Sequence, residues 1–324
     1  MTTHDRMTQL GRYRGCLLGL AVGDALGAPV ENLKIEQIKK KYGAAGITDF
    51  MELGGLRPGS YTDDTQMSLA TAAGIIRARL ENKDPVVAVY EAYLEWFMSQ
   101  MNPSNRRGPG YTCLSALGSD KRGSLEKAIN NSKGCGGVMR TAPAGLVFLP
   151  GEAFRMGAEF AALTHGHPSG YLPAGFLPEM IAHIISGKSL IQALSLAESE
   201  LVRYDGHEET IGKIRLAKKL AGGNKGTDDA IREIGEGWVG EEALGISLYC
   251  ALRFHHDWEA AVLASVNHSG DSDSTGSITG AILGTHLGVD AIPARWVADV
   301  EDSGKIDKVA HELFTVTKDL TRGS

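Results

Sequence analysis

Apolar residues recur every three or four positions along most of this chain. The pattern predicts helices over 64–81, 85–100, 153–164, 174–186, 189–203, 208–221, 241–254, 257–266 and 274–288, separated by Gly, Pro, Asn and Asp. No segment shows the alternation that is typical of a strand. Long loops near 43–63, 102–112 and 130–138 are candidates for function, because loops on a rigid scaffold often carry it. Without a composition shift or a repeat, we expect an all-α fold and one compact domain over 1–324.

Glycine is unusually frequent, with 41 residues among 324, nearly twice the average usage of about 7%. Eight of these glycines fall every fourth position in two sets: Gly15, Gly19, Gly23 and Gly27, and Gly276, Gly280, Gly284 and Gly288. A glycine inside a helix costs about 1 kcal/mol relative to alanine, so close contact between helix backbones has to compensate. We therefore expect two central helices that pack through their glycine faces.

Charge and cysteine content restrict the partners and the compartment. The net charge of −6 argues against a nucleic-acid-binding surface, and four cysteines without a C-x-x-C pair suggest neither a disulfide framework nor a thiolate zinc site. Arg12 and Arg14, followed by GCLLGLAVGDALGA, imitate a signal peptide, but Asp24 interrupts the apolar run. No stretch approaches the roughly 18 apolar residues that span a bilayer. We expect a cytoplasmic protein that binds neither nucleic acid nor membrane.

Two short acidic motifs each precede a predicted helix. They are GSYTDDTQ, with Thr62, Asp63 and Asp64, and NHSGDSDSTG, with Asp271, Asp273 and Ser274. Either motif alone is as well explained by ordinary helix N-capping. Together, four carboxylates with neighbouring hydroxyls suit Mg²⁺, Mn²⁺ or Ca²⁺ rather than Zn²⁺. If they converge, two divalent cations would neutralise their charge.

The histidines leave a second class of enzyme as an alternative. His256 and Asp257, with His165 and His167 upstream, could form the histidine–aspartate pair of an all-helical metal phosphohydrolase. That alternative leaves the TDDT segment unexplained.

Five segments in order carry a resemblance to a known family. They are GCLLGLAVGDALGAPVE at 15–31, YTDDTQ at 61–66, GCGGVMRTAP at 134–143, LTHGHPSGYLPAG at 163–175 and HSGDSDSTGSITGAILG at 268–284. With these segments the chain resembles the ADP-ribosylglycohydrolase family, whose members remove ADP-ribose from modified proteins. The resemblance implies a single all-helical domain with two Mg²⁺ or Mn²⁺ ions. The implied partner is an ADP-ribosylated protein or an ADP-ribose-containing small molecule.

The resemblance also implies roles for individual residues. The metal ligands would be Thr62, Asp63, Asp64, Asp271, Asp273 and Ser274, with serine at 274 where many relatives have threonine. Glu31 would contact or gate the metal site and is the candidate for positioning or deprotonating the attacking water. The loop 130–140 would form a diphosphate cradle, with Ser132, Lys133, Gly134, Cys135, Gly136 and Gly137 as substrate-binding residues.

Three side chains near this cradle have alternative interpretations. Cys135 stands where asparagine is common in the family, and a catalytic thiol paired with His165 lacks an orienting third residue. His165 would touch the phosphate or ribose of the substrate. Tyr111 either stacks on the ligand or packs in the core.

Linkage specificity is the least determined property. Similarity to bacterial members favours ADP-ribosyl-arginine, with serine-linked and O-acetyl-linked ADP-ribose as alternatives. A non-catalytic ADP-ribose-binding module would require the loss of a ligand, and none of the implied ligands is lost.

Overall fold

A computed structural model of the chain describes residues 3–119 and 121–320, in which the regular elements are helices. The α-helices are α1 (Thr3–Gly27), α2 (Ile35–Tyr42), α3 (Asp63–Glu81), α4 (Pro85–Ser99), α5 (Tyr111–Leu117), α6 (Ala142–Val147), α7 (Glu152–Ala162), α8 (Pro168–Ile185), α9 (Leu190–Leu201), α10 (Glu208–Ala221), α11 (Thr227–Ile234), α12 (Gly240–Arg253), α13 (Trp258–Val266), α14 (Ser272–Leu287), α15 (Ala294–Asp299) and α16 (Ser303–Leu320). Short 3-10 helices are η1 (Ala28–Val30), η2 (Pro103–Asn105), η3 (Val138–Arg140) and η4 (Val289–Ala291). Extended pairing in these residues is limited to two isolated bridges, so the all-α prediction is confirmed.

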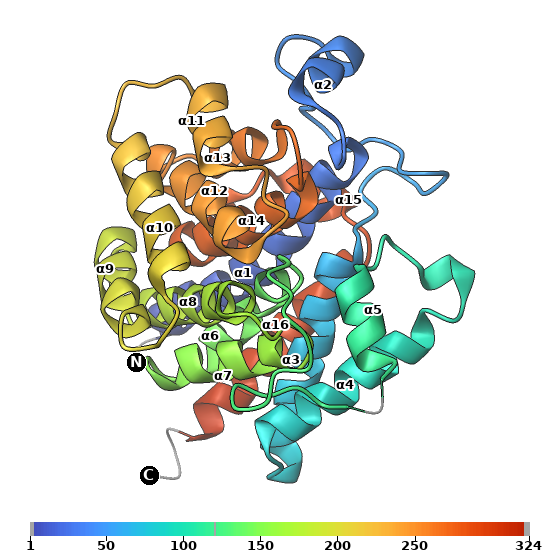
Figure 1. Ribbon diagram of the computed structural model, residues 1–324, viewed down its shortest axis with the longest axis vertical. Coiled ribbons are helices and arrows are strands. Elements are labelled where there is room, and N and C mark those ends of the chain that lie inside the picture. Colours follow the sequence, from blue (N-terminus) through green and yellow to red (C-terminus); the bar gives the residue numbers. More distant parts are fainter. Residues whose placement is uncertain (1–2, 120, 321–324) are drawn as a thin grey trace.

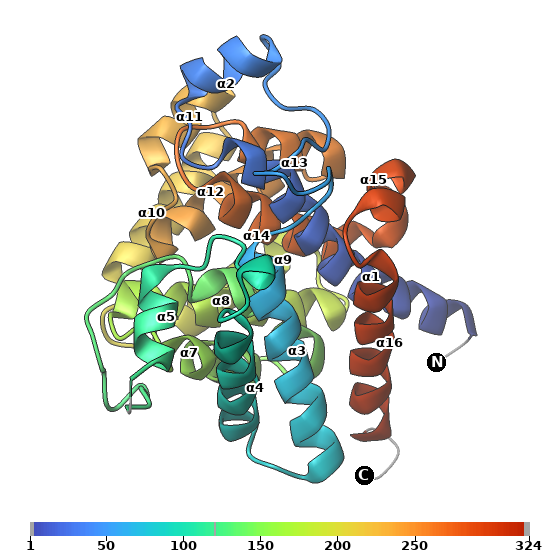
Figure 2. The ribbon, with the colours of Figure 1, turned by 90° about the vertical axis from the view of Figure 1, so that its right-hand side faces the viewer.

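Helices α1 and α14 pack against each other through their glycines at the centre of the molecule (Figures 1 and 2). A Cβ atom added to Gly280 would lie 2.6 Å from the carbonyl carbon of Gly19, and one added to Gly284 would lie 2.5 Å from that of Gly15. Gly23 and Gly276 oppose each other in the same way, so the two helices run antiparallel. The expected packing of the glycine faces is confirmed. Gly288 differs from the rest because it ends α14 with a φ of +86°.

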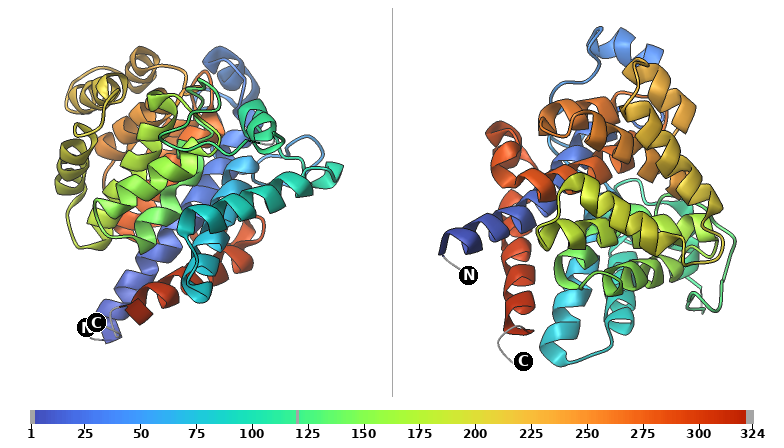
Figure 3. Two further views of the ribbon diagram at one scale, coloured as in Figure 1. Left: turned by 60° about the horizontal axis from the view of Figure 1, so that its bottom comes forward. Right: turned by 90° about the vertical axis from the view of Figure 1, so that its left-hand side faces the viewer.

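The other helices enclose this pair. Helices α6, α7 and α8 pack together on one side, and α10, α11 and α12 form a further layer (Figures 1 and 3). Helix α3 packs against α4 and α16, and all three lie on the side of the molecule that Figure 2 turns toward the viewer. The largest fully buried side chains include Trp258 and Trp296, whose rings lie 6.1 Å apart.

Most predicted helices are found within one or two residues of their expected ends, but α8 begins at Pro168 instead of 174. His167 caps this helix, because its Nδ1 accepts a hydrogen bond from the backbone N–H of Ser169 at 3.0 Å. Proline is favourable in the first turn, where its missing N–H has no partner to lose. Pro173 and Pro178, inside the helix, obscure its periodicity in the sequence.

The periodicity did not identify α2, α5, α6, α11, α15 and α16. All but α16 have at most eight residues, too few to display the period over several turns. Helix α16 does carry the signal, since Ile306, Ala310 and Leu313 are buried on one face. The loops expected at 102–112 and 130–138 exist, although η2 lies inside the first and α5 begins at Tyr111.

Within the described residues, no single helix has both the length and the hydropathy of a membrane span. One pair of segments, 7–30 and 35–42, passes that test only jointly and is bent by 92°.

Candidate active site

The two acidic motifs form helix N-termini, as expected from the sequence. Thr62 caps α3 by accepting a hydrogen bond from the N–H of Asp64 at 3.3 Å, and Asp271 caps α14 through the N–H of Ser274 at 3.4 Å. Both helix ends open into one cavity of about 220 Å³. The predicted residues that line it are Glu31, Asp63, Asp64, Tyr111, Gly134, Cys135, Gly136, His165, Asp271, Asp273 and Ser274.

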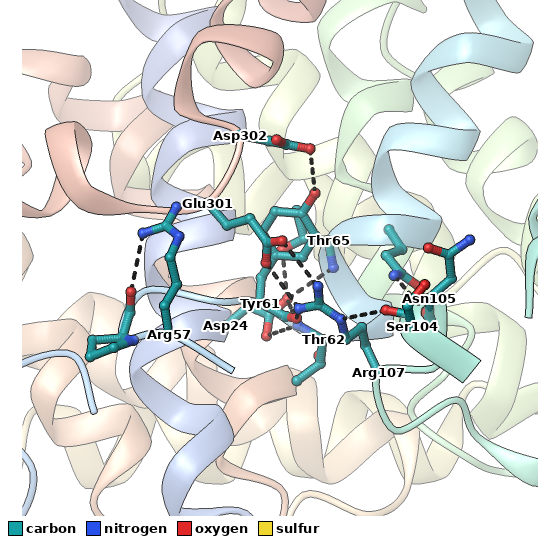
Figure 4. Close-up of polar contacts among 12 residues, drawn as sticks. Asp24, Arg57, Tyr61, Thr62, Thr65, Ser104, Asn105, Arg107, Glu301 and Asp302 are labelled. Carbon is teal, nitrogen blue, oxygen red and sulfur yellow. Dashed lines mark hydrogen bonds and ion pairs between the residues drawn. The ribbon is translucent and has the colours of Figure 1, made fainter. Parts of the chain in front are cut away.

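Asp24 connects these two helix ends, and it was not expected as a site residue. It lies on α1 and is fully buried, and its carboxylate accepts hydrogen bonds from the N–H groups of Thr62 (2.9 Å) and Thr65 (3.0 Å) and from the Thr65 hydroxyl (2.6 Å) (Figure 4). Helix α1 therefore holds the start of α3 while its glycines hold α14. The signal in the sequence was a single acidic residue inside an otherwise apolar, glycine-spaced run.

The cavity is lined by closely spaced acidic side chains whose charged forms disfavour one another. Burial and the neighbouring Asp273 carboxylate raise the pKa of Glu31 to about 8, and burial followed by Asp273 raises that of Asp24 to about 7. Burial and then Asp273 also raise the pKa of Asp63, Asp64 and Asp271 well above the usual aspartate value. Among the described residues, no lysine or arginine lines this cavity to compensate the charge.

This donor set fits hard divalent cations in its chemistry. One carboxylate oxygen of Asp64 and one of Asp273 are buried without a hydrogen-bond partner, an arrangement that is costly unless something binds them. In the described part of the chain, however, no three His, Cys, Asp or Glu side chains are already grouped closely enough to hold a metal ion. Ligation by Thr62, Ser274 and the four aspartates therefore stays a prediction.

Only some of the residues predicted to bind substrate in the loop 130–140 line the cavity, namely Gly134, Cys135 and Gly136. The N–H of Cys135 donates to Trp238 O at 3.2 Å, and the N–H of Gly134 donates to the Ser132 hydroxyl at 3.2 Å. Lys133 forms an ion pair with Glu209 at 2.6 Å. Ser132, Lys133 and Gly137 do not line the cavity, and a Cβ on Gly137 would instead meet the backbone of α8 at Gly170.

His165 lies against this loop and is neutral. Its ring is 1% exposed, and burial together with Arg140 lowers its pKa to about 3. Its Nδ1 is hydrogen-bonded to the Thr164 hydroxyl at 2.8 Å. Its Nε2 lies 3.2 Å from where a Cβ on Gly134 or Gly136 would be, so a side chain at either position would require the imidazole ring to shift by a few tenths of an ångström.

Cys135 is a protonated thiol. Its Sγ donates to Asp271 Oδ2 at 2.7 Å, and burial followed by the Asp271 charge raises the pKa of the thiol well above its usual value. A buried thiol beside a carboxylate is a poor nucleophile, so the structure gives no support to a catalytic Cys135–His165 pair.

Two further sequence alternatives are resolved by position. Tyr111 is 85% exposed at the cavity rim, so it is not a core residue. His256 and Asp257 line a different pocket from the one that contains His165. His165 therefore does not join His256 and Asp257 in one site, as the metal phosphohydrolase alternative requires.

The protein is thus an all-helical protein in which the acidic ends of two helices and a glycine loop meet at one cavity, and sequence comparison identifies the family. The chain belongs to the ADP-ribosylglycohydrolase family, whose sequence signature matches residues 5–322. A protein of Archaeoglobus fulgidus described only as uncharacterized is 30% identical over 309 residues, covering 94% of this chain and 96% of its own.

Named relatives are more distant. The ADP-ribosyl-dinitrogen reductase glycohydrolase of Rhodospirillum rubrum is 28% identical, covering 93% of this chain and 92% of its own. The ADP-ribosylarginine hydrolase Tri1 of Serratia proteamaculans is 26% identical, covering 94% and 79%. A solved structure described as an ADP-ribosylglycohydrolase-related protein complex shares the fold, with a TM-score of 0.69 at 23% identity over 96% of this chain and 99% of that one.

Proposed function

We propose that this protein hydrolyses the N-glycosidic bond between ADP-ribose and an arginine side chain of a modified protein. The observation that carries the proposal is the convergence of the acidic ends of α3 and α14 with Glu31 on one cavity beside the glycine loop. Membership of the ADP-ribosylglycohydrolase family supports an ADP-ribosyl substrate. The arginine linkage is favoured by the relative named as an ADP-ribosylarginine hydrolase.

Asp63, Asp64, Asp271, Asp273 and Ser274 in the cavity lining would hold two Mg²⁺ or Mn²⁺ ions together with Thr62, which is buried next to Asp63 but does not itself line the cavity. The unpartnered buried oxygens of Asp64 and Asp273, and the absence of lysine and arginine from the described residues of the lining, support this assignment. When bound, such ions supply positive charge that orients ribose hydroxyls and makes water more acidic.

The side chains of this chain would perform the proton transfer and the positioning. Glu31 lines the cavity and would take the proton of the attacking water as a general base. The carboxylates around it would stabilise the positive charge that develops at the anomeric carbon. The Nε2 edge of His165 lies against Gly134 and Gly136, which suits a hydrogen bond to a phosphate or ribose bound on the loop.

The test is release of free ADP-ribose from arginine-linked ADP-ribosylated protein in the presence of Mg²⁺ or Mn²⁺. Parallel reactions with serine-linked protein, O-acetyl-ADP-ribose and a simple phosphate ester identify the linkage. Cleavage of the phosphate ester alone would refute the proposal, and binding of ADP-ribose without turnover of any substrate would indicate a binding module.

Asp271→Ala should abolish both hydrolysis and the rise in melting temperature that Mg²⁺ or Mn²⁺ produces. Asp290→Ala is the matched control, because Asp290 is exposed and lines a different pocket. Full activity in Asp271→Ala would exclude the two-metal assignment. Glu31→Gln should lower turnover while affinity for ADP-ribose is retained, and unchanged turnover would exclude Glu31 as the base.

A further inference from the structure

The connection between α15 and α16 contacts the segment that leads into Asp63. The Arg57 side chain donates to Asp299 O at 2.8 Å, and the N–H of Glu301 donates to Gly59 O at 2.8 Å. The Tyr61 hydroxyl donates to the Asp302 carboxylate at 3.3 Å. The segment between α15 and α16 is thus hydrogen-bonded to residues 57–61, immediately before Thr62, Asp63 and Asp64.

Arg107 joins this connection to Asp63 itself. Its guanidinium forms a two-pronged ion pair with Glu301 at 2.9 and 3.0 Å and also donates to Tyr61 O at 3.4 Å (Figure 4). Its backbone carbonyl accepts the N–H of Asp63 at 3.0 Å. That N–H is one of the unpaired donors at the start of α3, so Arg107 completes the helix end that carries the predicted metal ligand.

The loop that contains Arg107 also forms part of the cavity. Gly108 and Gly110 line it, and the N–H of Gly110 donates to Asp63 Oδ2 at 3.4 Å. Asp63 is therefore contacted at its backbone by Arg107 and at its carboxylate by Gly110. Release of the Arg107 side chain would free both contacts together.

The ion pair between Arg107 and Glu301 is suited to holding the loop 106–110 in place. Its side chains are 13% and 23% exposed, which makes it the least exposed arginine or lysine ion pair in the described chain. Bidentate arginine–carboxylate pairs with little exposure are stronger and more directional than exposed surface pairs.

We propose that Arg107 and Glu301 are a positioning pair that fixes the loop 106–110 against Asp63 and so tunes the affinity of the cavity for its divalent cation. The inference rests on the proposed function, because it takes Asp63 as a cation ligand. Partners that orient a metal ligand typically change metal affinity about 10- to 100-fold when removed.

The first experiment measures the Mn²⁺ concentration that gives half of the maximal thermal stabilisation. Arg107→Gln, Glu301→Gln and the double variant should each require about tenfold more Mn²⁺ than the wild type, with the double variant no worse than either single variant. Arg107→Lys, which keeps the charge but loses the two-pronged geometry, should fall between. Arg14→Gln is the control, since it removes another ion pair to α16, with Asp307, at a distance from the cavity.

Unchanged Mn²⁺ affinity in the folded single variants, or losses of affinity that add in the double variant, would overturn the pairing.

A second measurement does not depend on the cation. Trypsin should cleave after Arg106 or Arg107 faster in Glu301→Gln than in the wild type or in Asp307→Asn, with the cut identified by mass spectrometry. Equal cleavage rates would also count against the pairing. If the wild type binds Mn²⁺ but releases no ADP-ribose, the proposed function fails while the positioning pair stands.

Discussion

Gly280→Ala tests whether close backbone contact between α1 and α14 holds the fold together. The added Cβ would lie 2.6 Å from the carbonyl carbon of Gly19, where carbon atoms normally approach to about 3.5–4.0 Å. Because the obstacle is backbone, no side-chain rotation can relieve it, and the helices would have to separate by roughly 1 Å. Overpacking costs about 1–3 kcal/mol, and alanine recovers about 1 kcal/mol of helix propensity. From the upper end of that range we expect a net loss of about 2 kcal/mol in the free energy of unfolding.

The assay is urea denaturation followed by circular dichroism, with Gly212→Ala as the matched control. Gly212 also lies inside a helix, α10, but it is exposed and a Cβ there would meet nothing within 4 Å. That variant should gain up to about 1 kcal/mol. If Gly280→Ala is as stable as the wild type, or gains as much as Gly212→Ala, the packing argument is refuted.

Two further predictions concern buried groups. Asp24→Ala leaves the N–H groups of Thr62 and Thr65 without their acceptor, so the free energy of unfolding measured by urea denaturation should fall by about 3 kcal/mol. Asp24→Asn should lose less stability. Equal losses in the two variants would contradict the hydrogen-bonding role of Asp24. Burial lowers the pKa of His268 from 6.5 to about 4, so the unfolded chain takes up a proton that the folded protein resists. The contribution of neutral His268 to the free energy of unfolding is complete above pH 6.5 and is lost as the pH falls toward 4, by up to about 3 kcal/mol. His268→Gln should therefore weaken the dependence of stability on pH in this range. If the stability of His268→Gln depends on pH as that of the wild type does, another group causes the loss of stability at low pH.

The acidic motifs show how far sequence patterns reach. Thr62 and Asp271 could be recognised as helix caps because serine, threonine and aspartate before an apolar-periodic segment satisfy the first N–H groups of a helix. Whether the two caps share a cavity depends on how α1 and α14 pack, which a local pattern does not contain. The glycine spacing supplied that information indirectly, since it predicted which helices approach each other.

The glycine loop shows where such reasoning stops. The family resemblance of the sequence implied an anion-binding loop over 130–140, but the N–H groups of Gly134 and Cys135 already donate within the protein. Lys133 turns to Glu209, 76 residues away. Ser132, which accepts the N–H of Gly134, lies in the loop itself, but Trp238 and Glu209 come from distant segments, so the loop's composition alone could not show which of its donors stay free.

The sequence by itself determined the helical class, the helix ends at both acidic motifs and the existence of two glycine faces, because each is a pattern of residues a few positions apart. Only the tertiary structure decided that Asp24 holds the start of α3, that Cys135 donates to Asp271, and that Arg107 pairs with Glu301 across 194 residues. The physical reason is that a buried polar group takes whichever partner the packing brings within hydrogen-bonding distance, and packing is a property of the whole chain.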